Sequence, residues 1–336
     1  MLLDVQDLTK IFRGRGLNLK GRKDFLAVDN VAFSIEENTI FGLVGESGSG
    51  KTTVARNVLF LEKPSSGKIL FNGVSLSDLS GTQLRTERQK MQIIFQDPNA
   101  SLNPKLTIKR SMEEGLKNRG VGKEERDKRI DELLETVGIS SSHKRRYPHE
   151  FSGGQKQRII IARALSMDPD FLILDEPVSN LDVSIQAQVI NLLLDLKRQF
   201  SLTYLFISHD LNLISYLSDT IGVMFSGRIV EMAPTEAIIK DPRHPYTVHL
   251  FSSVPGSTRK REKDQEKVII RDTMETAAEA VKKEEKRNTG GCSFFESCPR
   301  REEKCMERPP ELQDVGGGHY AACFYPDSFM EKDSVG

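Results

Sequence analysis

Residues 45 to 53, GESGSGKTT, combine glycines, a lysine and two threonines in a pattern that could bind a phosphate. They fit G-x-x-x-x-G-K-S/T through Gly45, Gly50, Lys51 and Thr52, between a short apolar run and a stretch with helical spacing. Glycines let backbone N–H groups and a helix N-terminus face a phosphate, while Lys51 offers a charge and Thr52 a Mg²⁺ ligand. A plain glycine turn is the alternative, but the context favours nucleotide binding.

Two carboxylates follow the apolar run FLIL at residues 171 to 174, where they would lie at the end of a buried strand. Asp175 is placed to hold the Mg²⁺ shell, and Glu176 to orient or deprotonate a water that attacks the γ-phosphate. A strand that merely ends in solvent-facing acids is the alternative, and the phosphate loop upstream weakens it.

A second pattern suited to an anion is FSGGQKQR, at residues 151 to 158. Ser152, Gly153 and Gly154 stand just before a long helical run, so that the start of this helix could bind another phosphate group. Two phosphate-binding loops with one catalytic strand indicate that the nucleotide is held between two copies of the chain or between two related chains.

The elements that must position these residues alternate along the chain. Short apolar runs at 40–44, 91–95, 171–175, 204–208 and 221–225 lie between stretches with helical spacing. This alternation predicts an α/β fold with a parallel sheet core. Strand-like runs in the first 35 residues and at 67–74 predict a small antiparallel β subdomain. Residues 105 to 140 have helical periodicity without a strand signal, which predicts a helical insertion.

Composition narrows the class of protein. The chain has 336 residues, of which 38% are hydrophobic, and its formal net charge is zero, so no excess of cations argues for wrapping nucleic acid. The start MLLDVQDLTK lacks the features of a secretory signal, and no apolar run reaches the length of about 20 residues that spans a membrane. We therefore expect a cytosolic chain with no nucleic-acid partner, which would lie beside a membrane if one is involved.

Taken together, these motifs resemble the ATP-binding cassette ATPases, whose signature is SGGQ, over roughly residues 1 to 255. The resemblance implies a P-loop NTPase cassette and an ATPase that converts ATP and water to ADP and phosphate. Gln96 matches the glutamine that meets Mg²⁺ or the attacking water, and His209 the switch histidine that contacts the γ-phosphate. Asp182 matches the residue that reaches across the dimer; nearby, Asn180 stands where the family more often has alanine. The remaining nucleotide contacts implied are Phe12, which would stack on adenine, and Ser47, Gly48, Thr53 and Gln155.

Finer resemblance is to the ATPase subunits of oligopeptide/dipeptide importers, nearest the F-type subunit, through QDPNASLNPKLTI, RYPHEFSGGQKQRI and DPRHPYTVHLFSSVP. It implies a peripheral subunit on the cytoplasmic face, with two permease subunits, a D-type ATPase or a second copy, and an extracytoplasmic peptide-binding protein as partners. Two alternatives stay open: a soluble, non-transport cassette protein of the iron–sulfur assembly kind, and an importer of nickel or another solute.

All four cysteines of the chain lie in its last 45 residues, at Cys292, Cys298, Cys305 and Cys323. A reducing cytosol disfavours structural disulfides, so a metal site is expected. Zinc sites usually contain close cysteine pairs, which are lacking here, and four thiolates with a Cys-Pro suit a [4Fe–4S] cluster better than Zn²⁺. Similar cysteine-containing tails in the resembled subfamily favour the cluster too. His319 could replace a ligand, although a surface histidine is the simpler interpretation.

The predicted organisation has three parts. Residues 1–255 form the nucleotide-binding domain, with a helical subdomain at about 97–165; residues 256–290 form a charged linker with a helical part; residues 291–336 form a small metal-binding extension.

Overall fold

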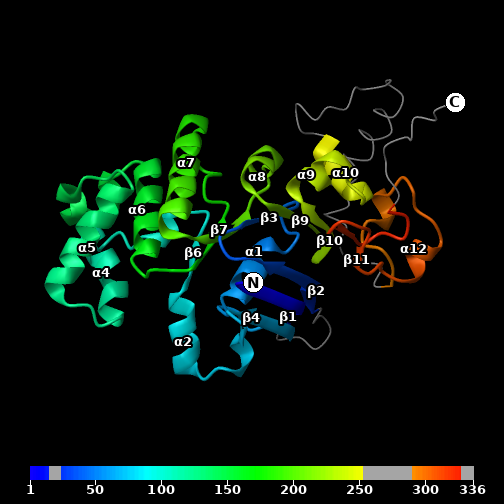
Figure 1. The fold of residues 1–336 in the computed structure, drawn as a ribbon, viewed down its shortest axis with the longest axis horizontal. Coiled ribbons are helices and arrows are strands. Elements are labelled where there is room, and N and C mark those ends of the chain that lie inside the picture. Colours follow the sequence, from blue (N-terminus) through cyan, green and yellow to red (C-terminus); the bar gives the residue numbers. More distant parts are fainter. Residues whose placement is uncertain (15–23, 253–289, 327–336) are drawn as a thin grey trace.

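The computed structural model describes residues 1–14, 24–252 and 290–326 (Figure 1). The predicted charged linker, together with its helical part, therefore lies almost wholly outside the described residues. The domain bounds at 255 and 290 stay predictions.

The centre of the molecule is an eight-stranded sheet with the order β11-β12-β10-β9-β3-β8-β7-β6. In that order its strands are β11 (Gln313–Asp314), β12 (Tyr320–Ala321), β10 (Arg228–Pro234), β9 (Thr220–Phe225), β3 (Ile40–Val44), β8 (Thr203–Ile207), β7 (Phe171–Asp175) and β6 (Met91–Ile94). Strands β9, β3, β8, β7 and β6 pair in parallel, as the alternation predicted. The sheet is nevertheless mixed, because β10 and β12 join one edge in antiparallel pairing, and β11 follows in the same way.

A second sheet, with the order β2-β1-β4-β5, confirms the small antiparallel subdomain. Its strands are β1 (Leu3–Phe12), β2 (Phe25–Ile35), β4 (Ser66–Phe71) and β5 (Val74–Ser75). Figure 1 shows it below the main sheet, with helix α1 between the two.

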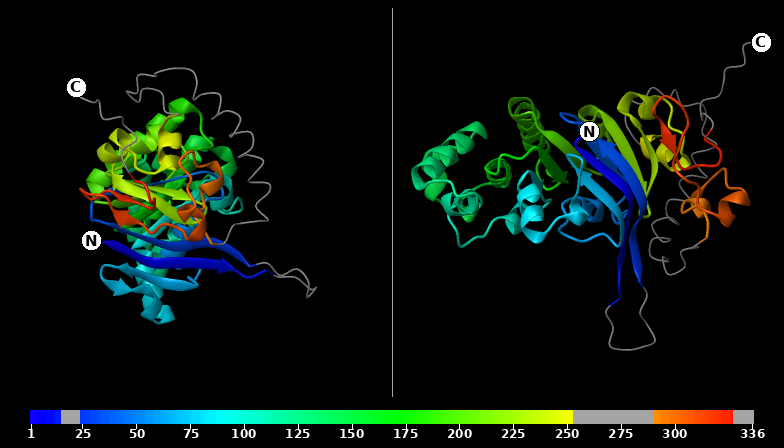
Figure 2. Two further views of the ribbon diagram at one scale, coloured as in Figure 1. Left: turned by 90° about the vertical axis from the view of Figure 1, so that its right-hand side faces the viewer. Right: turned by 60° about the horizontal axis from the view of Figure 1, so that its bottom comes forward.

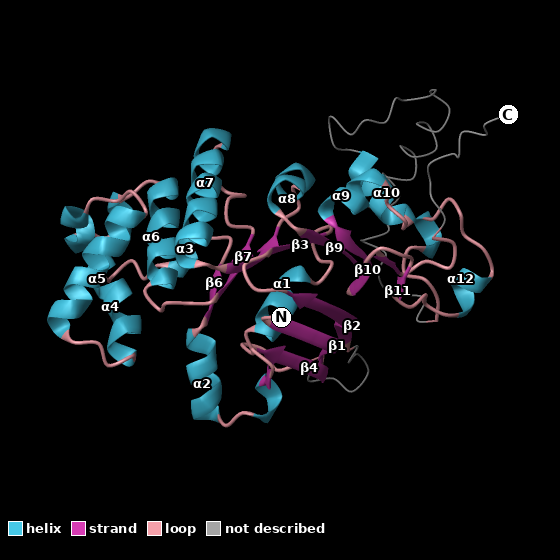
Figure 3. Ribbon diagram, viewed as in Figure 1, coloured by secondary structure: helices cyan, strands magenta, loops and turns pink. Residues whose placement is uncertain are grey.

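Helices cover the main sheet and extend from one end of it (Figure 3). They are α1 (Lys51–Val58), α2 (Gly81–Gln89), α3 (Pro98–Ser101), α4 (Ile108–Asn118), α5 (Lys123–Thr136), α6 (Gly153–Leu165), α7 (Val183–Phe200), α8 (Leu211–Leu217), α9 (Thr235–Lys240), α10 (Pro245–Ser252) and α12 (Lys304–Glu307), with 3-10 turns at Leu76–Asp78, Ser141–Arg145, Pro148–Glu150 and Phe295–Ser297. The helices from α3 to α6 are inserted between β6 and β7, where the sequence predicted a helical group.

Strand β7 shows how the core is built. All five of its residues are buried, as expected for an apolar strand of a parallel sheet covered on both faces. Successive side chains alternate between faces: Leu172 and Leu174 pack in the cluster that includes α6 and α7, and Phe171 and Ile173 in the cluster under α1 and the small sheet. Each such side chain contributes about 1.5–3 kcal/mol by burial. The main sheet is thereby fixed from both sides.

The cysteine-containing segment is attached to the same sheet rather than standing apart from it. Strand β12 pairs with β10, so that Tyr320 faces Met232, and the amide of Ala322 donates to the carbonyl of Val230 at 2.8 Å. Figure 2 shows the red strands of this segment beside the edge of the main sheet. The extension thus continues the main sheet at this edge.

Candidate functional site

The phosphate loop links the end of β3 to the start of α1. Gly50 begins the helix with φ at 107°, a left-handed conformation that L-residues with side chains seldom adopt. A Cβ at this position would also lie 2.5 Å from the carbonyl oxygen of Ala27. The sequence requires glycine here for both reasons, and the loop curls so that helix α1 begins directly behind it.

Lys51 lies inside this loop, with only 6% of its surface exposed. Its Nζ donates to the carbonyl oxygens of Gly45 and Glu46, at 2.7 Å each. Burial lowers the pKa of Lys51, although Glu176 and Asp175 act in the opposite direction. A buried ammonium held mainly by neutral carbonyls is well placed to interact with an incoming phosphate anion.

The two carboxylates stand at the end of β7, facing the loop. Asp175 is 5% exposed and accepts a hydrogen bond from Thr52 Oγ1 at 3.2 Å, so the two predicted Mg²⁺ ligands lie together. Burial raises the pKa of Asp175. Glu176 follows with φ at 50°, in the left-handed region, and its amide donates to the carbonyl of Ile207 at 2.9 Å. Such a backbone conformation costs energy and fixes the direction of the glutamate side chain.

Gln96 and His209 meet at the same glutamate. Gln96 Nε2 lies 3.1 Å from Glu176 Oε2, and His209 Nδ1 lies 3.2 Å from Glu176 Oε1. The three residues follow β6, β8 and β7, which are neighbours in the sheet and end at the same edge. Ligand sites of parallel α/β sheets form at the carboxyl ends of the strands. The fold therefore gathers the phosphate loop, both carboxylates, the glutamine and the histidine at one edge.

Asn180 adds a contact that the sequence did not predict. Its Nδ2 donates to the carbonyl oxygen of Gln96 at 3.2 Å, which ties the segment after β7 to the segment after β6. The sequence shows that this position departs from the alanine that is usual in the family, but it does not indicate that Asn180 contacts Gln96.

The SGGQ segment forms the start of α6 in the predicted way. Ser152 caps the helix by accepting from the amide of Gln155 at 3.4 Å, and Gln155 Oε1 accepts the amide of Ser152 at 3.0 Å. A Cβ on Gly154 would lie 2.5 Å from Cγ2 of Ile185, so this helix start packs tightly against α7.

The same segment lies away from the phosphate loop of its own chain. Figure 1 shows α6 beyond α7, on the far side of the sheet from the end that carries α9 and α10, while α1 lies at the centre. Asp182, which caps α7 without a side-chain hydrogen bond, and Val183, which is 81% exposed, stand beside it at the surface. The described chain therefore does not bring together the two helix starts that the sequence predicts to bind phosphate.

The other predicted nucleotide contacts are exposed or near the surface. Ser47 and Gly48 are exposed in the loop, and Thr53 is half-buried in α1. Phe12 ends β1 opposite Phe25 with 38% of its surface exposed, and the Nζ of Lys10 lies 5.1 Å from its ring centroid. Adenine stacking by Phe12 stays a prediction.

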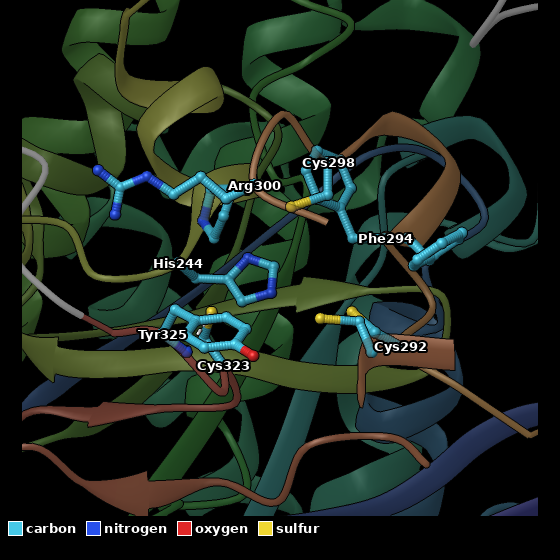
Figure 4. Close-up of a pocket in the computed structure, with 10 residues that line it drawn as sticks. His244, Cys292, Phe294, Cys298, Arg300, Cys323 and Tyr325 are labelled. Carbon is cyan, nitrogen blue, oxygen red and sulfur yellow. Dashed lines mark hydrogen bonds between the residues drawn. The ribbon is translucent and has the colours of Figure 1, made fainter. Parts of the chain in front are cut away.

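The four cysteines, which are 31 residues apart at most in the sequence, line one pocket (Figure 4). The sulfur atoms of Cys292 and Cys298 point toward the space beside the His244 ring, and Cys323 lies under Tyr325. The lining residues are His244, Pro245, Cys292, Phe294, Phe295, Cys298, Arg300, Cys305, Cys323 and Tyr325.

All four thiols are free of disulfides. Burial raises the pKa of Cys292 and Cys298, and raises that of Cys323 to about 11, with a further contribution from the neighbouring thiols. Within residues 1–14, 24–252 and 290–326, no group of three or more His, Cys, Asp or Glu side chains could hold a metal ion as it stands. The four predicted ligands therefore line one pocket, but the described residues do not show the ligand geometry of a metal site.

Two histidines near this pocket differ from what the sequence suggested. His319 is not a surface residue: it is 6% exposed, and its Nε2 lies 2.7 Å from Oε1 of the fully buried Glu231. It is also absent from the pocket lining. His244 does line the pocket and is buried, and its Nδ1 accepts from the amide of Tyr246 at 3.1 Å. Burial lowers the pKa of His244 to about 3, so this ring is neutral. The sequence around His244 contains no signal that places this histidine beside the cysteines.

Comparisons with known proteins agree with the motifs. Residues 28–179 match the ABC transporter family, and residues 230–305 match the C-terminal region of oligopeptide/dipeptide transporters. The oligopeptide transport ATP-binding protein AppF of Bacillus subtilis is 43% identical over 325 residues, which is 96% of each chain. OppF of the same organism is 48% identical over 257 residues, which is 76% of this chain and 82% of that protein.

A solved structure has the same fold over most of the chain. It is the dimeric, post-hydrolysis state of the ATP-binding cassette MJ0796 with ADP and Pi, which has a TM-score of 0.61 and 28% identity and covers 70% of this chain and 99% of its own. Within the part of the chain that the structure describes, no helix is long and apolar enough to cross a membrane. From the motifs, the fold and these relatives together, we conclude that the chain belongs to the ATP-binding cassette family of transporter ATPases, in its oligopeptide/dipeptide group.

Proposed function

We propose that this chain is the ATP-hydrolysing subunit that powers import of dipeptides or oligopeptides through a membrane permease. The observation that carries the proposal is the convergence of Gln96 and His209 on Glu176 beside the phosphate loop. The peptide cargo is inferred from the relatives, which are oligopeptide transport ATP-binding proteins. The match to the C-terminal region of oligopeptide/dipeptide transporters favours this function over transport of nickel or another solute and over a non-transport task.

In the proposed reaction, backbone N–H groups of the phosphate loop and the ammonium of Lys51 bind the phosphates of ATP. Thr52 and Asp175 hold Mg²⁺, which neutralises the phosphate charge when bound. Glu176 orients or deprotonates the attacking water, a role that contributes about 10² to 10⁴ in rate. Gln96 and His209 occupy both carboxylate oxygens of Glu176 in this state, so they are positioned to align it.

A second cassette completes the site in this proposal. Ser152, Gly153, Gly154 and Gln155 lie away from the phosphate loop of their own chain, and Asp182 is exposed beside them. A related D-type ATPase or a second copy would present these residues to the γ-phosphate. Shifting the equilibrium between the open and the closed pair of cassettes from 1:99 to 99:1 requires that ATP bind the closed state more tightly by about 5.5 kcal/mol. We assign this energy to γ-phosphate contacts made only in the closed state.

The further partners proposed are two permease subunits, docked on the helical group at about 97–165, and an extracytoplasmic peptide-binding protein that acts through them. This places the chain on the cytoplasmic face of the membrane. Co-purification with the permease and ATP-dependent peptide uptake into reconstituted vesicles test this proposal. Uptake of Ni²⁺ but not of peptide, or purification without any permease, would contradict it.

For the cysteine pocket we propose a [4Fe–4S] cluster, with Zn²⁺ as the alternative. The four thiols line one pocket and carry no disulfide, which fits a cysteine-ligated group. The cluster is preferred to Zn²⁺ because the four cysteines include no close pair of the kind that zinc sites usually contain, and because Cys298 is followed by a proline. The cluster would crosslink and so stabilise a segment that is too small to form its own hydrophobic core.

Anaerobic purification with iron, sulfide and zinc analysis tests this assignment. We expect iron and sulfide in equal amounts and a broad absorbance band, both lost in Cys323→Ser and kept in Ser297→Ala, which changes an exposed neighbour of Cys298. Stoichiometric zinc without sulfide would overturn the cluster.

A further inference from the structure

The phosphate loop is held from behind by Tyr246 on α10. The tyrosine is 1% exposed, and its hydroxyl oxygen accepts a hydrogen bond from the amide of Glu46 at 3.2 Å, across 200 residues of sequence. The carbonyl of Glu46 accepts from Lys51 Nζ at 2.7 Å. Both backbone polar groups of Glu46 are thus hydrogen-bonded, the carbonyl to Lys51 and the amide to Tyr246.

The ring of Tyr246 is in turn held by the cysteine segment. Phe294, which is 8% exposed, lies 5.6 Å from Tyr246 and 5.8 Å from His244, measured between ring centroids. Phe225 of β9 completes the group, 4.5 Å from Tyr246 and 5.4 Å from Phe294. Packed aromatic rings at these separations stabilise each other by about 0.5–1.5 kcal/mol beyond their burial. Phe294 therefore fixes the position of the tyrosine that holds the loop.

Phe294 also lines the cysteine pocket and lies between two of its thiols in sequence. The amide of Cys292 donates to the carbonyl of Cys305 at 2.7 Å, which closes the segment around Phe294. The segment is further tied to β10 through β12 and through the contact of His319 with Glu231. A continuous set of contacts therefore runs from the cysteines through Phe294 and Tyr246 to the phosphate loop.

We infer that Tyr246 is a positioning residue for the phosphate loop, and that the cysteine segment sets its position through Phe294. The C-terminal segment then contributes to nucleotide affinity without touching the nucleotide. That the occupant of the cysteine pocket modulates this affinity rests on the proposed metal site. The positioning itself does not.

The first test uses the full, metal-free chain and the variant Tyr246→Phe, which removes only the hydroxyl. We expect the Kd for a fluorescent Mg·ATP analogue to rise about two- to tenfold, the range of one net hydrogen bond. Amide exchange of Glu46 should accelerate as well, which a general loss of stability would not confine to this loop. The matched control is Tyr204→Phe, because Tyr204 is equally buried and its hydroxyl donates to the carbonyl of Leu193 in α7 rather than to the phosphate loop. Unchanged affinity and exchange in Tyr246→Phe would overturn the inference.

The second test asks whether Phe294 acts through Tyr246. Phe294→Leu should accelerate amide exchange at Glu46 and lower the affinity for the analogue. The double variant with Tyr246→Phe should bind the analogue no less tightly than Tyr246→Phe alone. Residues of one contact chain are non-additive in this way. Phe295→Leu is the control, since Phe295 lines the same pocket but is half-buried. Its ring centroid lies 5.9 Å from Cζ of Arg301, so its ring contacts this arginine. Additive effects, or a Glu46 amide that exchanges as in wild type, would contradict the coupling.

The third test compares the wild-type chain reconstituted with iron and sulfide with the metal-free chain. We expect the Kd of the analogue to differ by about twofold or more between the two forms. The nucleotide should then change the affinity for the metal by the same factor, because thermodynamic linkage is reciprocal. The difference should vanish in Phe294→Leu. Failure to bind metal would reject the proposed metal site and leave the positioning to be decided by the metal-free tests. Metal binding without any change in Kd would reject the coupling.

Discussion

The contact between His319 and Glu231 allows a quantitative prediction about what attaches the cysteine segment. Glu231 is fully buried and accepts three hydrogen bonds of 2.7 Å, from His319 Nε2 and from the amides of Arg243 and His244. In the variant His319→Leu, the carboxylate keeps the two backbone donors and loses the side-chain donor. A hydrogen bond to a charged group contributes about 1.5–3 kcal/mol.

The size of the expected change in melting temperature follows from chain length. Unfolding entropy is about 2.1 cal/mol/K per residue near 60 °C, so that 336 residues give about 0.7 kcal/mol/K. The loss then corresponds to a Tm lower by about 2–4 °C. His319→Gln, whose amide can still donate to Glu231, should lose less than half as much.

The assay is thermal unfolding followed by circular dichroism, together with amide exchange of Ala322, whose hydrogen bond to Val230 pairs β12 with β10. The control is His149→Leu, which changes an exposed histidine and should leave both readings unchanged. A Tm within about 1 °C of wild type for His319→Leu, with Ala322 still protected, would refute the assigned role of this pair.

Three further predictions concern the nucleotide site. Lys51→Ala should lower the affinity for a fluorescent ATP analogue by at least about tenfold, because it removes the buried ammonium of the phosphate loop. Unchanged affinity would count against the phosphate-loop assignment. Gly154→Ala should lower ATPase activity of the assembled transporter but leave nucleotide binding by the isolated chain intact, since its Cβ would meet Ile185 at 2.5 Å, away from the phosphate loop; weaker binding by the isolated chain would contradict this. Asn180→Ala should lower the hydrolysis rate by less than about threefold, because the hydrogen bond that it loses is exposed; a loss above about tenfold would show a larger role.

Much of the nucleotide site could be predicted because its residues lie in short contiguous motifs. The glycines, Lys51 and Thr52 are adjacent in sequence, and Asp175 and Glu176 end an apolar run, so the strand-loop-helix context was readable. The meeting of Gln96 with Glu176 depended on resemblance, since periodicity alone does not place the ends of β6 and β7 side by side.

The remaining features depend on contacts between distant segments. Strands β11 and β12 have two residues each, too few for a period-two pattern, so their addition to the sheet was not predictable. The burial of His319 follows from that pairing, which brings it to Glu231 across 88 residues. The contact of Tyr246 with Glu46 likewise has no local signal, because an aromatic residue in an apolar helix predicts only burial.

The most direct test of the account is hydrolysis by Glu176→Gln in the assembled transporter. The amide keeps the size of the side chain and can still bond to Gln96 and His209, but it cannot accept a proton from water. We predict that Mg·ATP binds with nearly wild-type affinity while turnover falls by about 10²- to 10⁴-fold, leaving the paired cassettes closed on ATP. Turnover near the wild-type rate would contradict the role of Glu176, and with it the assignment of the site at the ends of β6, β7 and β8.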